Sequence, residues 1–342
     1  MPKVLKLIFL LSICVSCHAQ KLTAKDSISI FYDRFFSVLK TEYLLKNAID
    51  WKTIESETRQ NISKHETFKS ALQETRIVFD KIGGTHCKVM FQNENYGAKI
   101  DIPALENFSE QWKAKNATKP SFEVKVLDGK YGYILLPSLK YNDFSPAYTH
   151  KIAQPLYDKI HEIKTKHKIE GWILDLRFNL GGNDAPMLLA LYDFLGDNAV
   201  WGTLDSDKKP YAKTRLSKGR YFSDSYKVSH INPKGESLEK AKVAVITGLL
   251  TASSGEVTAL AFKGRPNSIF IGEPTLGMTT ANVVKPMPFD ALLVVSIAYD
   301  CDRNGTYYEK ITPDIAISKK DNFDDLLLDE NILQAIKFVS GT

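Results

Sequence analysis

Cysteine is scarce in this sequence, because its 342 residues contain only four: Cys14, Cys17, Cys87 and Cys301. The first two lie in a leader-like N-terminal segment, so the remainder of the chain retains one pair. Two cysteines far apart in the sequence do not form the closely spaced ligand pairs of a structural zinc site. In an exported protein they would form one disulfide or remain buried thiols, and both outcomes stay open.

Long apolar stretches are lacking beyond the N-terminus. There, two lysines precede a short apolar stretch, Leu7 to Val15, and Cys17-His18-Ala19 resembles a small-residue cleavage site. This pattern predicts a secretory signal over residues 1–19, too short to span a membrane. A second interpretation takes the residues up to Cys17 as a lipoprotein signal, with Cys17 lipidated. Both predict an exported protein without a transmembrane span, either secreted into the periplasm or lipid-anchored in the cell envelope.

The sequence also lacks a strong charge of one sign. Its formal net charge is +5, and loss of Lys3 and Lys6 with the signal would lower this by two. No long basic run is present, so nucleic-acid binding gains no support. The chain after residue 19 is long enough for one large domain or two modest ones.

Hydrophobic periodicity divides the chain into two parts. Ile28, Phe31, Phe35 and Leu39 recur at spacings of three and four, which predicts a small helical N-terminal region over residues 20–82. From residue 83 to 342, strand-like and helix-like segments alternate. This alternation predicts an α/β core with a partly parallel mixed sheet and flanking helices.

The expected elements of this core begin with a hairpin, in which strands 122–127 and 131–136 are joined by Asp128-Gly129. Residues 92–120 are polar and irregular, and 202–240 resemble an excursion with little core of its own. The remaining expected elements are helix 146–168, strand 172–176, helix 183–195, strand 243–247, helix 256–263, strand 268–271 and strand 292–299.

The segment Thr251-Ala252-Ser253-Ser254-Gly255-Glu256 carries the strongest chemical signal, because it links the apolar strand 243–247 to a helix. A small-residue turn at this point exposes a serine hydroxyl, and the free N–H groups of the helix point toward whatever that serine attacks. Ser253-x-x-Glu256 also fits a helix capping box, in which the serine only satisfies backbone donors. The two roles are compatible.

A second segment, Asp175-Leu176-Arg177-Phe178-Asn179-Leu180-Gly181-Gly182, ends a buried strand and opens a helix. Two adjacent glycines let the backbone approach a ligand with free N–H groups. Fixed donors of this kind can stabilise an oxyanion. The alternative is a plain tight turn between a strand and a helix.

These two segments are followed by Gly-Glu-Pro-Thr at 272–275 and Ile-Thr-Pro-Asp-Ile at 311–315. In this order, over roughly residues 83–316, they resemble the tail-specific (C-terminal processing) and tricorn-type serine peptidase family. The resemblance implies a ClpP/crotonase-like α/β fold and hydrolysis of peptides or unfolded proteins without metal or organic cofactor. Tail-specific members insert a PDZ domain, for which residues 92–120 are too few, so the substrate pocket must come from the core.

The family uses two catalytic styles. Tail-specific members place a lysine after the Gly-Glu-Pro-Thr segment, where this sequence has Met278, and methionine cannot accept a proton from serine. Lys285 and Lys310 remain as alternative bases in other contexts. The resemblance to tricorn therefore implies histidine as the base.

The tricorn-like style implies a triad of Ser253 as nucleophile, His86 as base and Glu309 as the residue that orients the base. Thr85, beside His86, would help to position the histidine or the glutamate. The oxyanion would be bound by the N–H of Ser254 and that of Gly181 or Gly182. A disulfide between Cys87 and Cys301 would then pin the strand that carries the base to the hairpin that carries Glu309.

Two rival functions belong to other classes. One is a catalytically inactive peptide- or lipid-binding protein on the same scaffold, because a fold does not fix its chemistry. The other is a structural cell-envelope protein in which Ser253 is only a helix cap. The sequence leaves the oligomeric state open.

Overall fold

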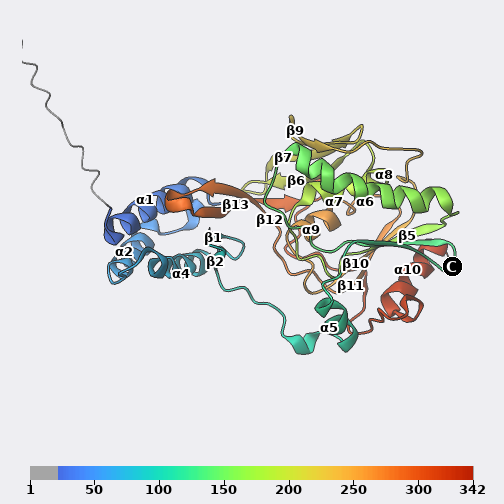
Figure 1. The fold of residues 1–342 in the computed structure, drawn as a ribbon, viewed down its shortest axis with the longest axis horizontal. Helices are drawn as coiled ribbons and strands as arrows, with labels where there is room; N and C mark the ends of the chain where they lie inside the picture. Colours follow the sequence, from blue (N-terminus) through green and yellow to red (C-terminus); the bar gives the residue numbers. More distant parts are fainter. Residues whose placement is uncertain (1–21, 342) are drawn as a thin grey trace, which may run out of the picture.

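The computed structural model describes residues 22–341, so the predicted signal over 1–19 and the lipidation site at Cys17 lie outside the described residues. Figure 1 shows two lobes joined by a long strand and by a loop. The smaller lobe holds the first helices, and the larger lobe holds the parallel sheet. Within residues 22–341, no helix combines the length and apolarity that a bilayer crossing requires.

The smaller lobe contains four helices: α1 (Ala24–Glu42), α2 (Trp51–Ile62), α3 (Phe68–Ala71) and α4 (Gln73–Ile82). The predicted apolar face of α1 is buried in this lobe. The same core includes Val89 of β1 (Lys88–Phe91) and Leu293 and Val295 of β13 (Leu292–Cys301). Strand β13 pairs with both β1 and β12 (Thr280–Pro286). The hydrophobic core therefore runs across the predicted boundary at 82/83 and draws in strands from the C-terminal half.

The larger lobe is built on a sheet of order β14-β11-β10-β5-β4-β3. Its strands from β14 to β4 pair in parallel, and β3 pairs antiparallel with β4. This arrangement confirms the predicted α/β class, the partly parallel sheet and the hairpin. The bounds are β3 Glu123–Leu127, β4 Tyr131–Leu135, β5 Gly171–Asp175, β10 Val243–Thr247, β11 Ser268–Gly272 and β14 Ile315–Ala316.

Helices cover both faces of this sheet (Figure 1). Trp172 and Leu174 of β5 pack on the side of α6 (Pro146–Lys166), α7 (Asp184–Ala190) and α9 (Ser254–Leu260), whereas Ile173 packs on the other side. That other side is covered by α5 (Glu110–Ala117) and α10 (Glu330–Ser340). Every residue of β5 and β10 is buried, which explains why both strands are mainly apolar.

The second sheet has the order β2-β1-β13-β6-β7-β8-β9, with β12 paired to β13, and its pairings are antiparallel. Strand β13 joins the lobes, because residues 292–294 pair with β1 and residues 299–301 pair with β6. This strand brings the segment around His86 toward the larger lobe. The bounds are β2 Glu94–Gly97, β6 Ala199–Leu204, β7 Pro210–Ser217, β8 Arg220–Ser223 and β9 Tyr226–His230.

Three segments differ from the sequence expectations. The excursion at 202–240 forms most of a β-meander, whose Leu216 and Tyr221 are buried in the core of the larger lobe. Residues 92–120 contain β2 and α5, not only irregular chain. The predicted helix 183–195 is divided at Leu191 into α7 and α8 (Tyr192–Leu195).

Of the two outcomes left open for the cysteine pair, the structure shows buried thiols, since Cys87 and Cys301 are both free and buried. Cys87 Sγ lies 3.4 Å from the backbone nitrogen of Ser296. Cys301 lies five residues further along β13, a distance of roughly 17 Å in an extended strand. A disulfide needs Cα atoms within about 7 Å, so the fold keeps the two thiols apart.

Candidate active site

Ser253 stands where β10 gives way to α9, at the N-cap of that helix. Its backbone has φ 55° and ψ −122°, a conformation that residues other than glycine rarely adopt. Holding a serine there costs on the order of 1–3 kcal/mol, which the surrounding structure must supply. The sharp turn presents the Ser253 hydroxyl to the smaller lobe.

His86 reaches this hydroxyl from the other lobe. Helix α4 ends at Gly83, with φ 68°, and the next residue, Gly84, donates its N–H to the Phe79 carbonyl (2.8 Å). The chain then turns so that Cys87 is buried and His86 faces Ser253. Nε2 of His86 lies 3.1 Å from Oγ of Ser253. The fold thus brings together two predicted site residues that are 167 positions apart.

The second ring nitrogen of His86 faces a row of neutral groups. Nδ1 lies 3.0 Å from Oγ1 of Thr280, which lies 3.1 Å from Oγ of Ser296, and Ser296 donates to Oδ1 of Asn282 (2.8 Å). An amide oxygen can only accept, so the single Ser296 proton is committed to Asn282. Thr280 must then donate to Ser296 and accept from Nδ1–H. The row therefore leaves Nε2 unprotonated, facing the nucleophile.

Glu309 does not occupy the position predicted for it. Its side chain is exposed and forms no hydrogen bond to His86 among residues 22–341, whereas its carbonyl accepts from the Thr279 hydroxyl (3.2 Å). Thr85 is also exposed, and its N–H donates to the Gly83 carbonyl. The expectation that Glu309 and Thr85 flank the base is corrected, because β12 places Thr280 against Nδ1 instead.

Burial controls the protonation of His86. Removal of the imidazole from water, reinforced by the nearby Lys88 ammonium, lowers the pKa of His86 to about 4. The shift from the ordinary value of 6.5 corresponds to about 3 kcal/mol against the charged ring. His86 is therefore neutral at pH 7, which is the form that can accept a proton.

Glu256 organises the turn that carries Ser253. Its Oε2 accepts from the N–H groups of Ser253 (2.9 Å) and Met278 (2.8 Å). Its Oε1 accepts from the Gly277 N–H (2.9 Å) and the Thr275 hydroxyl (2.5 Å). The carboxyl is fully buried, and this burial raises its pKa. Glu256 thus ties the nucleophile turn to segment 275–278, where Met278 contributes its backbone in place of the family's lysine.

The two glycines of the 175–182 segment lie against the nucleophile. A Cβ on Gly181 (φ 93°) would stand 2.8 Å from Cβ of Ser253 and 3.1 Å from the Ser254 nitrogen. A Cβ on Gly182 (φ 126°) would stand 2.1 Å from the Leu139 carbonyl oxygen. Only glycine fits either position. The Ser254 hydroxyl donates to the Gly182 carbonyl (2.7 Å) and fastens this turn to α9.

Comparison with known proteins places this site in a family. Residues 130–317 match Peptidase family S41. This chain belongs to peptidase family S41. It is therefore a serine-type peptidase by class, and the family's substrates are peptides.

The S41 peptidase also resembles individual proteins. It is 32% identical over 203 residues to the nisin-resistance protein of Lactococcus lactis subsp. lactis, a match that covers 58% of each chain. Its fold is similar to a lipoprotein from Streptococcus agalactiae, with a TM-score of 0.66 and 20% identity over 94% of this chain and 97% of that one. A candidate peptidase from Parabacteroides merdae gives a TM-score of 0.56 and 15% identity over 93% and 97%.

Arg177 of the S41 peptidase has a structural role that the sequence did not reveal. Its guanidinium is buried and bonds Asp175, Asp321 (2.6 Å) and Asp329 (2.8 Å). Asp329 also caps α10 by accepting from the Asn331 N–H. This cluster locks the C-terminal helix to the end of β5. Removing one partner of such a buried network typically costs about 3–5 kcal/mol.

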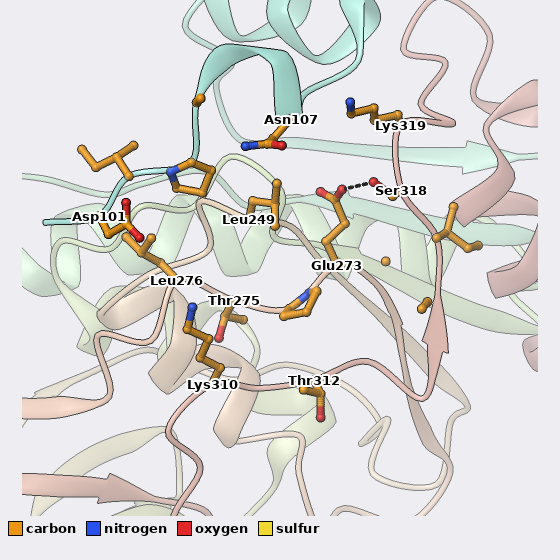
Figure 2. Close-up of a pocket in the computed structure, with 17 residues that line it drawn as sticks. Asp101, Asn107, Leu249, Glu273, Thr275, Leu276, Lys310, Thr312, Ser318 and Lys319 are labelled. Atoms are coloured by element: carbon orange, nitrogen blue, oxygen red, sulfur yellow. Dashed lines mark hydrogen bonds between the residues drawn. The ribbon is translucent and has the colours of Figure 1, made fainter.

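The alternative lysine bases do not contact the nucleophile. Lys285 pairs with Glu42 of the smaller lobe (2.7 Å). Lys310 lines a cavity of about 960 Å³ beside the Gly-Glu-Pro-Thr segment, where Figure 2 shows it next to Thr275 and Leu276. Neither lysine forms a hydrogen bond to Ser253, so His86 is the basic side chain that contacts the nucleophile among the described residues.

The same cavity is coupled to the nucleophile turn. Figure 2 shows Glu273 bonded to Ser318 across it (2.6 Å). Thr275, a lining residue, donates to Glu256, which in turn accepts from the Ser253 N–H. The cavity lies at the carboxyl ends of β10 and β11, the edge at which parallel sheets bind ligands.

Proposed function

We propose that this chain is an exported S41 peptidase that cleaves peptide bonds through a Ser253–His86 dyad. The observation that carries the proposal is the 3.1 Å contact between the Ser253 hydroxyl and the unprotonated Nε2 of His86. The nucleophile and its base are within hydrogen-bond reach, and the base is held by a further group, Thr280. This is the arrangement that activates a serine hydroxyl for attack.

In the first step, Ser253 Oγ attacks the peptide carbonyl while Nε2 accepts its proton. His86 then donates that proton to the leaving amine, and an acyl-enzyme remains. Water releases the acyl group, with His86 again acting as the base. Throughout, Nδ1–H stays bonded to Thr280, which keeps Nε2 as the reacting nitrogen.

The oxyanion would be bound by backbone N–H groups at the glycine turn and at the start of α9. Gly181 donates its N–H to Oδ1 of Asn179 (3.0 Å). This engagement favours the N–H groups of Ser254 and Gly182 as the donors. One such donor typically lowers the barrier by about 3 kcal/mol.

Export is part of the proposal because the signal pattern at residues 1–19 supports it. Cleavage after Ala19 or lipidation of Cys17 are its two forms. Peptides or unfolded segments are the proposed substrates.

A fluorophosphonate probe, which labels activated serines, tests the dyad directly. We expect labelling of the purified protein that disappears in Ser253→Ala and in His86→Ala. Ser223→Ala, an exposed serine on β8, is the matched control and should label normally. Folding of each variant is checked by thermal melting. Absence of labelling in the folded wild type would favour the inactive binding protein.

A further inference from the structure

The meander of β7, β8 and β9 buries one of its faces and exposes the other. Leu216 and Tyr221 pack into the core of the larger lobe. Along β7, the alternate residues Tyr211, Lys213 and Arg215 are exposed, because successive side chains of a strand point to opposite faces. Figure 1 shows β7 and β9 at the top of the larger lobe. The exposed side is called the outer face below.

The outer face is strongly cationic. Residues 208–227 contain seven lysines and arginines but a single acidic residue, Asp224. This stretch therefore carries a formal charge of +6, whereas the whole chain carries +5. Its exposed cations include Lys213, Arg215, Arg220 and Lys227, and none of these four forms an ion pair in the described part of the chain. The positive charge of the protein is thus concentrated on this meander.

Aromatic rings lie among these cations. Arg215, Phe222 and Lys227 form one row across the three strands, since Arg215 pairs with Phe222 and Phe222 pairs with Lys227. The guanidinium of Arg215 lies 4.1 Å from the centre of the Phe222 ring. Tyr211 on the same face and Tyr226 at the start of β9 are 62% and 68% exposed. The outer face therefore combines unpaired positive charge with exposed aromatic rings.

We propose that the outer face docks the protein on a lipid bilayer that carries anionic headgroups. The headgroup phosphates would neutralise the lysine and arginine side chains. The tyrosine rings fit the boundary between headgroups and acyl chains, where amphipathic rings gather. A polymer that carries only negative charge would pair with the cations but leave the rings without a partner. The proposal draws on the export part of the proposed function and is independent of the dyad.

Docking of this kind depends on charge and salt in a defined way. Each basic side chain next to an anionic bilayer typically strengthens binding about fivefold. Salt weakens this attraction, since charges in solution are screened beyond about 8 Å at physiological ionic strength. Binding by the outer face should therefore be reversible and sensitive to the loss of single charges.

Sedimentation with lipid vesicles tests the docking. The chain from residue 20 onward keeps both lobes and removes the apolar signal, which would bind lipid by itself. This protein is mixed with vesicles of phosphatidylcholine alone, or of equal parts phosphatidylglycerol and phosphatidylcholine, and the bound fraction gives each Kd. We expect binding to the anionic vesicles to be at least about tenfold tighter, and the preference should decrease as salt is added.

Charge-removing variants then locate the docking surface. Lys213→Gln combined with Arg215→Gln should weaken binding to anionic vesicles about 25-fold, because two charges are lost. Arg220→Gln combined with Lys227→Gln should have a similar effect. Melting temperatures verify that each variant is folded.

Two further variants separate the surface from general charge and from its rings. Lys52→Gln combined with Lys240→Gln is the matched control, because it removes two exposed lysines, one on α2 and one before β10. Its binding should stay within about twofold of the wild type. Tyr211→Ser should weaken vesicle binding about threefold, since less apolar area enters the bilayer boundary. It should leave any binding of polyglutamate unchanged.

Equal binding to neutral and anionic vesicles overturns the proposal, as does failure to bind either. A control variant that loses as much binding as the meander variants overturns it as well. Polyglutamate that binds as tightly as the anionic vesicles, with no effect of Tyr211→Ser on vesicle binding, overturns it in favour of an acidic polypeptide partner. Fluorophosphonate labelling separates these results from failure of the proposed function, since that probe reports Ser253 without lipid.

Discussion

Different kinds of interaction position the two residues of the proposed dyad. Ser253 is strained, and its turn is fixed by the buried carboxyl of Glu256 through four hydrogen bonds and by the close approach of Gly181. His86 is held at the junction of the lobes by neutral hydroxyl groups, starting with Thr280. The nucleophile is thus positioned by buried charge and backbone geometry, whereas the base is positioned by neutral side chains.

This difference has a chemical consequence. A carboxylate beside the imidazole would raise the basicity of the ring, whereas Thr280 supplies only a dipole. Burial and Lys88 then act almost unopposed and lower the pKa of His86 to about 4. The base stays neutral over a wide pH range, but it binds its proton weakly.

Glu256→Gln should distort the turn that carries Ser253, and we expect the largest effect from this substitution. The amide would place an NH₂ group against backbone donors that now bond a carboxyl oxygen. We expect the free energy of unfolding to fall by about 3 kcal/mol, as when buried polar groups lose their partners. Displacement of Ser253 should lower kcat/KM roughly 100-fold.

Urea denaturation and peptide hydrolysis measure the two effects. The control is Glu162→Gln, since Glu162 forms an exposed pair with Lys166 worth less than about 1 kcal/mol. Wild-type activity in a folded Glu256→Gln protein would contradict the organising role of Glu256.

The next largest effect should be the dependence of kcat/KM on pH, which reports the protonation of His86. Because the pKa of His86 is about 4, kcat/KM should stay level down to about pH 5 and fall tenfold per unit below pH 4. A histidine at its ordinary pKa would place this fall near pH 6.5. A fall near 6.5 in the rate profile would refute the burial argument.

The same shift predicts a change in stability. The unfolded chain protonates His86 below pH 6.5, whereas the folded chain does so only below about 4, so stability is lost as pH falls through this window. Between pH 7 and 5, the wild type should lose about 2 kcal/mol more than His86→Gln. Urea denaturation of both proteins at each pH measures the difference, and parallel curves would contradict it.

Thr280→Val tests the neutral row behind the base. Valine keeps the shape of threonine but cannot accept the Nδ1–H of His86. We expect kcat/KM to fall about tenfold, the equivalent of roughly 1.4 kcal/mol. Glu309→Gln is the paired variant, and it should change kcat/KM less than threefold because its side chain is exposed. A larger loss in Glu309→Gln than in Thr280→Val would restore the glutamate to the triad.

The smallest expected effect concerns the strain at Ser253. Glycine adopts φ 55° without strain, whereas alanine does not. Ser253→Gly should therefore be more stable than Ser253→Ala by about 1 kcal/mol, after the larger entropy of unfolded glycine is subtracted. Thermal melting of the two inactive variants measures this difference. Equal stability would show that the turn relaxes when the hydroxyl is removed.

Much of the larger lobe could be predicted from local sequence. The apolar run at 243–247, the small-residue turn after it and the following helix identified the setting of Ser253, because each signal lies within a few residues. The glycines at 181 and 182 were recognisable for the same reason. Strand β12 was missed, since its residues are only partly buried and carry no clear alternation.

The hydrogen-bond partner of His86 could not be predicted from the sequence, for a related reason. Thr280 is 194 positions from His86, and it reaches the ring only because β12 pairs with β13 while β13 pairs with β1. Glu309 was favoured because it lies close in sequence to the Ile-Thr-Pro-Asp-Ile segment at 311–315. That closeness in sequence did not bring its side chain to the imidazole.

The sequence by itself determined the α/β class, the S41 resemblance and the strand–helix turn at Ser253, because periodicity and turn chemistry act over short distances. The tertiary structure decided which groups face His86, how Glu256 is bonded and where the two cysteines lie. Those outcomes depend on the pairing of strands that are far apart in the chain, which brings Thr280 to the imidazole.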